Sequence, residues 1–439
     1  MLTYLKVGSK SLFNEESGMK RDVYIVGGVR TPFVKSFTSY KGLSTQELME
    51  HALKALVDRY ALKGELVGDV ALGALINSAK NWNMARECVL SSGLSPETPA
   101  YNVQRACGTS LETAYQIYAK IALGNMDSGI AGGVDTNTDA PLEVKPALRE
   151  LILKLRSANS LAEKLSALTS AQVRDLGIEA PAVVEPRTGL SMGQHCELMV
   201  KEWEISQAEQ DQIALQSHQN AARAYREGFY EDLVVPVGDI KKDSFIREDT
   251  SLQKLAALKP AFDKVAGTIT AGNASPLSDG ASAVLLSTKE KAQSRGWKLQ
   301  ARLVDFQATA VDFVGGAGLL MAPTQAVANL LARNGLKLQD FDYYEIHEAF
   351  AGQVCCTLKA WNSEAYCREV LKLEGKLGTI DQSKMNTVGG SIALGHPFAA
   401  TGGRILASLA KQLRGTRQRG LISICTAGGM GIAAIVEGA

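Results

Sequence analysis

Two of the seven cysteines lie where a thiol could be a reactive group. Cys107, in NVQRACGTSLETA, follows a predicted strand over 99–105 and precedes a predicted helix over 111–123. Backbone N–H groups at a helix N-terminus stabilise a thiolate and can bind an oxyanion during acyl transfer. Cys425 ends the run LISIC and opens TAGGMG, so we expect a thiol exposed at a strand end beside a glycine-rich turn. For either cysteine alone an inert buried thiol is the commoner case, so both are candidates.

Two histidines also lie in settings that favour chemistry. His396, in GGSIALGHPFAATGG, is surrounded by glycines, which let a backbone turn sharply and approach a ligand closely. An imidazole suits proton transfer near neutral pH. His347 opens HEAFAG after the predicted strand YYEI, at the strand end where ligands of α/β proteins gather. Each histidine could instead be a hydrogen-bonded structural residue.

Phosphate-loop and metal motifs are missing from the sequence. It contains no GxxxxGK[ST], and no GxGxxG follows the first predicted strand. The cysteines form no CxxC pair, which argues against a structural zinc site. The segment NASPLSDG at 273–280 is polar and typical of a turn, so Ser275 alone indicates only a turn serine.

The elements that position these residues alternate between strand and helix. Apolar periodicity predicts strands over 22–28, 67–76, 99–105, 129–134, 302–310, 342–346, 420–426 and 433–437, and helices over 45–60, 111–123, 323–334 and 401–413. This alternation predicts an α/β fold of layered helices and parallel strands.

The chain repeats part of its pattern. RYALKGELVGDVALGAL and RNGLKLQDFDYYEIHEAF share a helix, a Leu-Lys turn, an acidic residue and a strand in one order, which favours an internal duplication with halves at 22–290 and 297–439. The first half contains an insertion over about 136–262, with a charged helical stretch at 143–174, a turn at 181–187 and a long helix at 206–228. Structureless loops of this length are uncommon in compact domains, so we interpret the insertion as a lid or substrate-binding subdomain.

Composition narrows the class of protein. The 439 residues carry a formal net charge of +1, which gives no reason to expect a nucleic acid or an anionic membrane as the main partner. No apolar run approaches the roughly 20 residues that span a bilayer, and residues 1–22 lack a secretory signal pattern. Cysteines without framework-like spacing indicate free thiols in a reducing compartment, so we expect a cytoplasmic protein.

Taken together, the motifs resemble the thiolase family. The resemblance rests on RTPF at 30–33, CGTS at 107–110, GLSMGQHCE at 189–197, NASPLSDGAS at 273–282, HEAF at 347–350, GGSIALGHPFAATGGR at 389–404 and CTAGGMG at 425–431, which occur in the family's order. It spans about residues 22–439. HEAF in place of the commoner NEAF, with the long insertion, is similar to bacterial 3-ketoacyl-CoA thiolases and the β-subunits of trifunctional β-oxidation complexes. The resemblance implies two mixed-sheet α/β halves in a layered αβαβα arrangement with a helical loop insertion.

The resemblance implies four catalytic residues. Cys107 matches the nucleophile that becomes an acyl-thioester, and His396 matches the base that activates it. Cys425 matches the second cysteine, which exchanges a proton with the acetyl-CoA carbon or the incoming thiol. His347 stands where most of the family has an asparagine that positions an oxyanion-hole water, so a direct or water-mediated donor is implied.

Further residues match the substrate-binding positions of the family. Ser275 matches a serine beside the pantetheine arm, and Met192 and Phe350 match apolar lining near the thioester. Ala427 stands where a glycine contributes a backbone N–H, which alanine keeps. Ser191 stands where short-chain enzymes often have histidine.

The function implied is thiolysis of a 3-ketoacyl-CoA to acetyl-CoA and an acyl-CoA shorter by two carbons. CoA thioesters are substrates, and neither a metal nor a bound redox cofactor is expected. The resemblance also implies a homodimer and a possible hydratase/dehydrogenase α-subunit as partner. The apolar and basic residues that alternate over 143–174 predict that this stretch forms an acyl-chain tunnel or docks that partner, with a solvated amphipathic helix as the alternative. The alternatives are a biosynthetic acetoacetyl-CoA thiolase, a decarboxylating ketoacyl synthase and a catalytically silent acyl-CoA-binding subunit.

Overall fold

The computed structural model describes residues 20–170, 177–179, 181 and 184–439. Three expectations therefore fall partly outside the described residues: the missing secretory signal at 1–22, the end of the charged stretch at 171–174 and the turn at 181–187. Among the described residues, no helix is long and apolar enough to cross a lipid bilayer.

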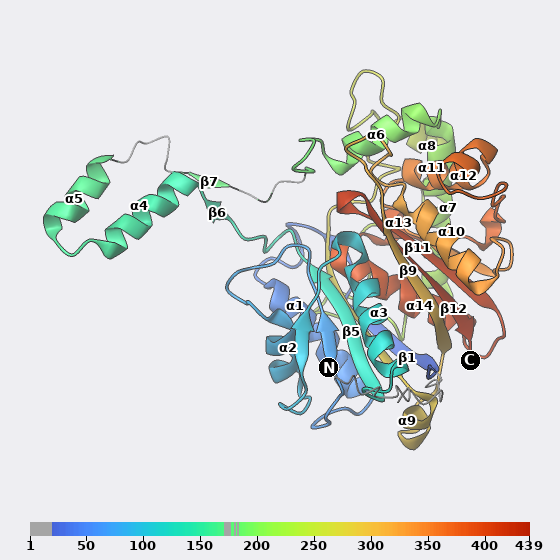
Figure 1. Cartoon of the computed structure of the whole chain (residues 1–439), viewed down its shortest axis with the longest axis horizontal. Helices are drawn as coiled ribbons and strands as arrows, with labels where there is room; N and C mark the ends of the chain where they lie inside the picture. The colour runs from blue at the N-terminus through green and yellow to red at the C-terminus, as the bar shows by residue number, and fades with distance from the viewer. Residues whose placement is uncertain (1–19, 171–176, 180, 182–183) are drawn as a thin grey trace, which may run out of the picture.

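A ten-stranded mixed sheet runs through the molecule (Figure 1). Along it the strands follow the order β10-β11-β12-β9-β1-β8-β5-β3-β4, with β2 pairing beside β8. Their bounds are β1 Val23–Arg30, β2 Val34–Lys35, β3 Val70–Leu72, β4 Ala100–Asn102, β5 Ser128–Asp135, β8 Ser278–Ser287, β9 Ala301–Ala310, β10 Tyr343–Ile346, β11 Arg419–Thr426 and β12 Met430–Gly438.

The strand order contains the same arrangement twice, which confirms the predicted duplication. In the first half, β3 runs parallel to β5, which pairs antiparallel with β8, which pairs antiparallel with β1. In the second half, β10, β11, β12 and β9 repeat these relations in the same order. The halves join where β1 pairs antiparallel with β9, at Val23 opposite Leu303.

The parallel strands expected from the alternation of elements are only part of the sheet, and the mixed sheet implied by the resemblance is confirmed. β8 and β12 run antiparallel to their neighbours, and β8 was not predicted at all. Its ten residues are all buried, although polar Ser278, Asp279 and Ser282 give the segment the composition of a turn. The Asp279 carboxylate accepts hydrogen bonds from the Ser36 hydroxyl and the Asn137 N–H, which makes its burial tolerable.

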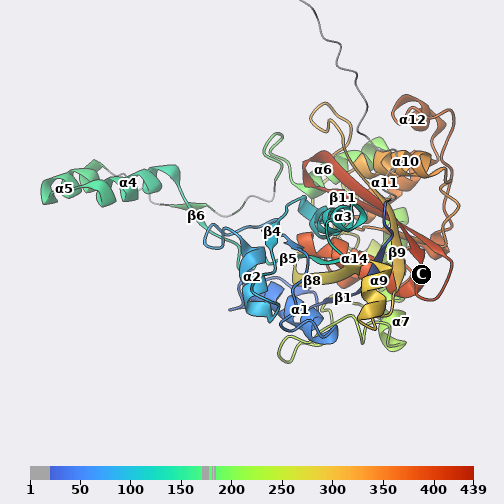
Figure 2. The same cartoon turned by 60° about the horizontal axis from the view of Figure 1, so that its bottom comes forward.

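Helices form three layers around the two halves of the sheet (Figures 1 and 2). α3 (Thr109–Ala122) and α14 (Thr401–Leu413) pack on each other in the central layer, where Leu111, Ile117, Ile405 and Leu409 are fully buried or nearly so. α1 (Thr45–Arg59) and α2 (Met84–Ser92) cover the first half, whereas α10 (Ala322–Asn334) and α11 (Ala351–Trp361) cover the second. The layers follow the predicted αβαβα order.

Further helices and turns complete the body. They are η1 Ala106–Gly108, α6 Met192–Glu202, α7 Gln207–Arg226, α8 Leu252–Ala256, α9 Lys289–Ser294, α12 Glu364–Glu369, η3 Gln382–Lys384, α13 Ser391–Leu394, η4 Phe398–Ala400 and η5 Ala427–Gly429. The predicted helix at 206–228 is α7, which packs against α11 and α13. It begins with a capping box, in which the Ser206 hydroxyl accepts from Glu209 N–H and the Glu209 carboxylate accepts from Ser206 N–H.

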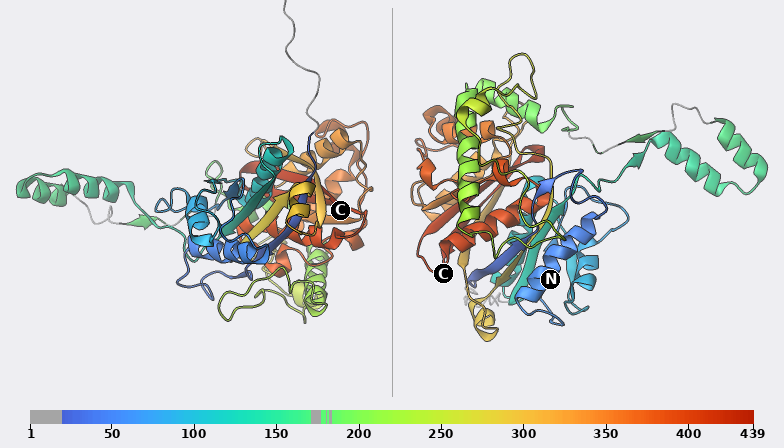
Figure 3. Two further views of the ribbon diagram at one scale, coloured as in Figure 1. Left: turned by 90° about the horizontal axis from the view of Figure 1, so that it is seen from below. Right: turned by 180° about the vertical axis from the view of Figure 1, so that it is seen from behind.

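The charged stretch forms a helical hairpin that projects from the body (Figures 1 and 3). It contains β6 (Glu143–Val144), α4 (Pro146–Ser157), α5 (Leu161–Ser170) and β7 (Ile178–Glu179), with β6 paired antiparallel to β7. Within the hairpin, α4 packs on α5 and β6 on β7. The expectation that this stretch forms an acyl tunnel or docks a partner, and the interpretation of 136–262 as a lid or substrate-binding subdomain, stay predictions. Periodicity identified its helices, but it carries no information on where an exposed hairpin points.

Candidate active site

Cys107 lies in the single turn η1, immediately before α3. Ala106 precedes it with a φ of +44°, a left-handed conformation that strains a residue with a side chain by about 1–3 kcal/mol. The thiol is buried, and its pKa is raised to about 12 because desolvation outweighs the hydrogen bonds from the Ala427 and Cys107 backbone N–H groups. The backbone N–H groups lower the pKa of the Cys107 thiol, as expected at a helix N-terminus, but burial outweighs them, so the thiol of the free protein is protonated.

His396 lies in the loop between α13 and α14. The helix α14 packs tightly against α3, the helix that follows Cys107. A Cβ on Gly402 would meet the backbone nitrogen of Leu111 at 2.5 Å, so only glycine allows α14 to approach α3 this closely. The backbone N–H of His396 donates to Ser278 Oγ at 3.0 Å, and its Nδ1 lies 2.6 Å from Thr401 Oγ1. Burial, and then the charge of Arg404, lower the His396 pKa to about 3, so the imidazole is neutral.

His347 directly follows β10, and its backbone N–H donates to Ser423 on β11 at 2.9 Å. Its ring is buried, and Nδ1 lies 2.9 Å from Ser391 Oγ. The rings of His347 and His396 have centroids 4.2 Å apart. Burial, followed by the neighbouring His396 and Arg404, lowers the His347 pKa well below its ordinary value.

Cys425 lies in β11 opposite Gly431 of β12, and only 1% of it is exposed. The expectation of a thiol exposed at a strand end was therefore wrong, because the strand continues through Thr426 and the Cys107 turn covers it. Burial, and then the neighbouring Cys107, raise the Cys425 pKa well above its ordinary value. The two thiols therefore lie close enough for an electrostatic interaction, although 318 positions separate them in the sequence.

The structure brings the four predicted catalytic residues together. The ligand atoms of Cys107, His347 and His396 all lie within 4.8 Å of one another, and Cys425 interacts with Cys107. The Nε2 atoms of both histidines have no hydrogen-bond partner, which leaves them free for a reacting group. A thiolate and two imidazoles also suit Zn²⁺, so within the described chain these three residues are the group that could hold a metal. The absence of a resident metal stays a prediction.

The predicted substrate-binding residues surround this cluster. Ser275 N–H donates to Ala349 at 3.0 Å, and its neighbour Ala274 pairs with Phe350, which is 8% exposed. Met192 opens α6 and packs, like Phe350, in the apolar cluster that contains Cys425. The Ala427 backbone N–H donates a hydrogen bond to the Cys107 thiol, so alanine supplies the backbone donor expected at this position. The Ser191 side chain, in contrast, caps α6 by accepting from Gln194 N–H.

Sequence reasoning missed a layer of buried polar residues behind the cluster. They are Asp135, Glu185, Ser391, Thr401 and Arg404. The Asp135 carboxylate accepts from Ala399 N–H at 2.7 Å and so holds the loop after His396. The Glu185 carboxylate accepts from Gly428 N–H at 2.8 Å and holds the turn after Cys425. For Asp135, Ser391, Thr401 and Arg404 the one signal was a polar residue inside or beside a glycine-rich run, whereas Glu185 gave no such signal.

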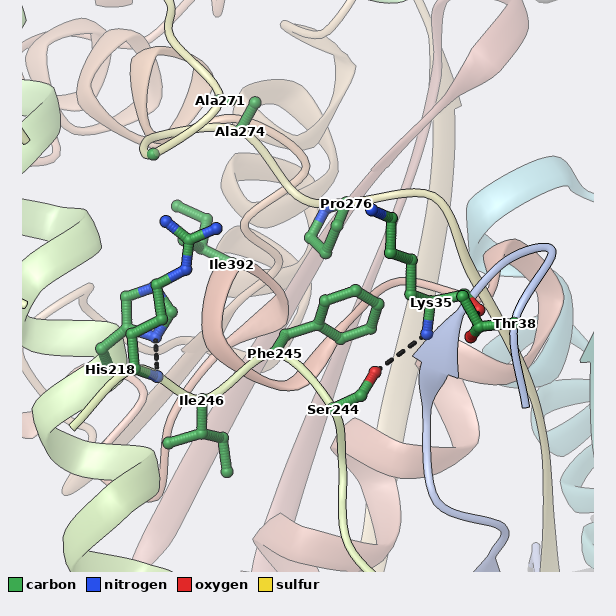
Figure 4. Close-up of a pocket in the computed structure, with 12 residues that line it drawn as sticks. Lys35, Thr38, His218, Ser244, Phe245, Ile246, Ala271, Ala274, Pro276 and Ile392 are labelled. Carbon is green, nitrogen blue, oxygen red and sulfur yellow. Dashed lines mark hydrogen bonds between the residues drawn. The ribbon is translucent and has the colours of Figure 1, made fainter. Parts of the chain in front are cut away.

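A cavity of about 380 Å³ lies next to the cluster (Figure 4). Its lining includes Lys35, His218, Phe245, Arg247 and Ile392, together with Ala274 and Pro276 on either side of Ser275. In Figure 4, Phe245 lies at the centre, with His218 on one side and Lys35 on the other. A Cβ on Gly395, the residue before His396, would meet the Phe245 ring at 2.7 Å, so the cavity adjoins the loop that carries His396.

Comparisons with known proteins agree with this geometry. The model of the thiolase N-terminal domain matches residues 23–290, and the model of the thiolase C-terminal domain matches residues 297–438. The chain is 39% identical over 422 residues to a protein named 3-ketoacyl-CoA thiolase from Yersinia pestis (strain Pestoides F), and the match covers 94% of this chain and 96% of the relative. A protein of the same name from Yersinia pseudotuberculosis serotype O:3 (strain YPIII) matches to the same extent.

Two solved structures share the fold. The acetyl-CoA acetyltransferase of Bacillus anthracis superposes with a TM-score of 0.79 at 30% identity, covering 96% of this chain and 100% of that one. Human mitochondrial 3-ketoacyl-CoA thiolase superposes with a TM-score of 0.77 at 29% identity, covering 96% and 99%. Both family models and these full-length matches lead to one conclusion: the chain belongs to the thiolase family.

Proposed function

We propose that the protein is an acyltransferase that cleaves a 3-ketoacyl-CoA with CoA, giving acetyl-CoA and an acyl-CoA two carbons shorter. The observation that carries the proposal is the convergence of Cys107, His347 and His396 within 4.8 Å, with Cys425 beside Cys107. A reaction that forms and breaks a thioester needs a nucleophile that is also a good leaving group, and a thiol serves both needs.

In the first half-reaction, Cys107 Sγ attacks the keto carbon and His396 Nε2 takes the thiol proton. The carbon–carbon bond breaks, and its electron pair forms the enolate of acetyl-CoA, whose oxygen accepts a hydrogen bond from an imidazole N–H. The Cys425 thiol protonates the enolate carbon and releases acetyl-CoA. The acyl group remains on Cys107 as a thioester.

In the second half-reaction, the Cys425 thiolate takes the proton of free CoA, and the CoA sulfur attacks the thioester. Cys107 leaves and regains its proton from His396, so both thiols return to their starting state. These steps balance with thiols, imidazoles and CoA, so we propose that neither a resident metal nor a redox cofactor takes part.

The cavity beside the cluster suits the CoA molecule. Its basic residues Lys35 and Arg247 offer positive charge to the phosphates, and the Ala274–Pro276 segment leads past Ser275 towards Phe350 and the cluster. We therefore propose that the pantetheine arm runs along this segment, with the phosphates outside.

The finer expectations on assembly and location remain proposals. We propose a homodimer whose projecting hairpin docks a hydratase/dehydrogenase subunit, supported by exposed apolar side chains on the hairpin, which are Ile152, Leu153, Leu161, Leu165 and Leu168. Sedimentation of the chain with and without 143–179 tests both points. All seven cysteines are free thiols, which supports a reducing compartment such as the cytoplasm.

The deciding experiment is CoA-dependent cleavage of 3-ketoacyl-CoA substrates of several chain lengths by the purified chain. We expect acetyl-CoA as a product, lost in Cys107→Ala. Activity with acetoacetyl-CoA alone would favour the biosynthetic alternative, and malonyl-dependent condensation without thiolysis would favour a ketoacyl synthase. Acyl-CoA binding without turnover would identify a silent subunit.

A further inference from the structure

The two site histidines share one arrangement with one difference. Each ring is buried, each leaves Nε2 without a partner, and each places Nδ1 against a side-chain hydroxyl. The hydroxyls belong to Ser391 for His347 and to Thr401 for His396. The difference lies in the second partner of each hydroxyl, because that partner decides which way the hydroxyl hydrogen points.

Behind His347, the second partner of the hydroxyl is a donor. Arg404 Nη2 lies 2.9 Å from Ser391 Oγ, and a guanidinium can only donate. Ser391 Oγ therefore accepts from Arg404. Its own hydrogen has no other acceptor among the described residues, so it is donated to His347 Nδ1. An imidazole that accepts at Nδ1 carries its proton on Nε2.

Behind His396, the second partner of the hydroxyl is an acceptor. Thr401 Oγ1 donates to the Pro397 carbonyl at 3.1 Å, and a carbonyl can only accept. The single Thr401 hydrogen is used there, so Thr401 Oγ1 accepts from Nδ1–H of His396 at 2.6 Å. The Nε2 atom of His396 is then an unprotonated base.

From these contacts we infer that the two imidazoles are held in opposite tautomers: His347 is a fixed donor through Nε2–H and His396 a fixed base through its bare Nε2. Ser391, Arg404 and Thr401 are positioning residues that set this difference. The inference rests on the proposed function for its catalytic meaning, but the tautomers follow from the hydrogen bonds alone. The two tautomers separate the two roles: His347 stabilises the enolate or thioester oxygen, and His396 takes the proton of Cys107.

The charge of Arg404 supports the same arrangement. Burial is the main cause that lowers the pKa of both His347 and His396, and the charge of Arg404 lowers both further, so both rings are neutral. Only a neutral imidazole has a tautomer to fix. Arg404 is itself 2% exposed, and its guanidinium also faces the Gly389 carbonyl at 3.5 Å. One buried cation thus adds to the effect of burial on both rings and orients the Ser391 hydroxyl.

Neutron diffraction from crystals of the perdeuterated, unmodified full chain tests the inference without substrate. We expect deuterium on Nε2 but not Nδ1 of His347, and on Nδ1 but not Nε2 of His396. Deuterium on the same nitrogen of both rings, or the reverse assignment, would overturn the inference. The result is independent of thiolysis, so an inactive protein with the expected tautomers would refute the proposed function and leave the inference standing.

Kinetics of two variants supply a second readout. Thr401→Val removes the acceptor of Nδ1–H, so we expect kcat to fall about 10- to 100-fold with KM within twofold, since general-base catalysis is worth roughly 10²–10⁴-fold. Thr401→Ser keeps the hydroxyl and should restore kcat to within about threefold. A Thr401→Ser variant as impaired as Thr401→Val, or a Thr401→Val variant with unchanged kcat, would count against the positioning role.

Discussion

The rings of His347 and His396 lie with centroids 4.2 Å apart, yet one follows a strand and the other precedes a helix of the second half. Cys107 enters the same space from the first half, at the start of the helix that packs against α14. The site thus depends on the packing of α3 on α14, and small residues at that contact control it. Gly402 is one such residue, because any side chain there would push the two helices apart.

We predict that Cys425→Ala separates the two parts of the reaction. Thiolysis of a 3-ketoacyl-CoA should fall by at least about 100-fold, because the enolate carbon loses its proton donor. Cys107 should still be acetylated by acetyl-CoA, since that transfer forms no carbon–hydrogen bond. A thiolysis assay and mass spectrometry of the intact chain measure the two effects.

Cys355→Ala is the matched control for that variant. Cys355 is a half-buried cysteine of α11 outside the catalytic group, and its loss should leave thiolysis within about twofold. Full thiolysis by Cys425→Ala would remove this residue from the mechanism.

We predict that alkylation of Cys107 in the free protein becomes steadily faster with pH. Burial raises its pKa to about 12, so the thiolate fraction should rise about tenfold per pH unit between pH 7 and 9. The rate of inactivation by iodoacetamide, with peptide mapping of the modified cysteine, measures this slope. A plateau below pH 8 would show a stabilised thiolate and contradict the effect assigned to burial.

The order of the elements and the identity of the reactive side chains were predictable because they depend on local signals. The apolar stripe Leu48, Ala52 and Leu56 predicts α1 without any tertiary information, and the structure adds a capping box between Ser44 and Glu47. The glycine-rich runs around His396 and Cys425 indicate close backbone approach in the same local way.

The features that escaped prediction depend on partners far away in the sequence. β8 was missed because its first residues have the composition of a turn. Asp279 can be buried there only because its hydrogen-bond donors lie more than 140 positions away in the sequence. The burial of Cys425 and the raised pKa of Cys107 arise only when the two halves close on each other. The roles of Ser391 and Thr401 likewise depend on a second partner that no sequence pattern reveals.

We predict that Lys35→Ala and Arg247→Ala weaken CoA binding through its phosphates. Each should raise the KM for CoA about 3- to 10-fold with little change in kcat, because a partly exposed charge pair contributes about 1 kcal/mol. The effect should shrink with rising salt. Steady-state kinetics at two ionic strengths measure both points.

A truncated substrate provides the internal control for the phosphate contacts. Pantetheine thioesters lack the nucleotide phosphates, so neither variant should change their KM. Lys289→Ala is the control for loss of a positive charge, because Lys289 is an exposed lysine at the start of α9. This variant should change neither the KM for CoA nor the KM for the pantetheine thioester. An equal loss with CoA and pantetheine substrates would show that the basic residues act on something other than the phosphates.

We predict that His218 makes the protein less stable as the pH falls below 6.5. His218 is buried in α7, and its Nδ1 accepts a hydrogen bond from the Arg247 N–H at 3.3 Å, which only the neutral ring can do. Burial, and then the charge of Arg247, lower its pKa to about 4. Between pH 6.5 and 4 the unfolded chain therefore binds a proton at this residue that the folded chain does not, so stability rises with pH across that window and is lost as pH falls.

At pH 5 the loss of stability from His218 is about 2 kcal/mol, at about 1.4 kcal/mol per pH unit. The free energy of unfolding from urea titrations at pH 7 and pH 5 measures it, and His218→Gln should lose about 2 kcal/mol less than the unmodified chain between these pH values. Equal losses in the two proteins would show that His218 carries a proton in both states or in neither.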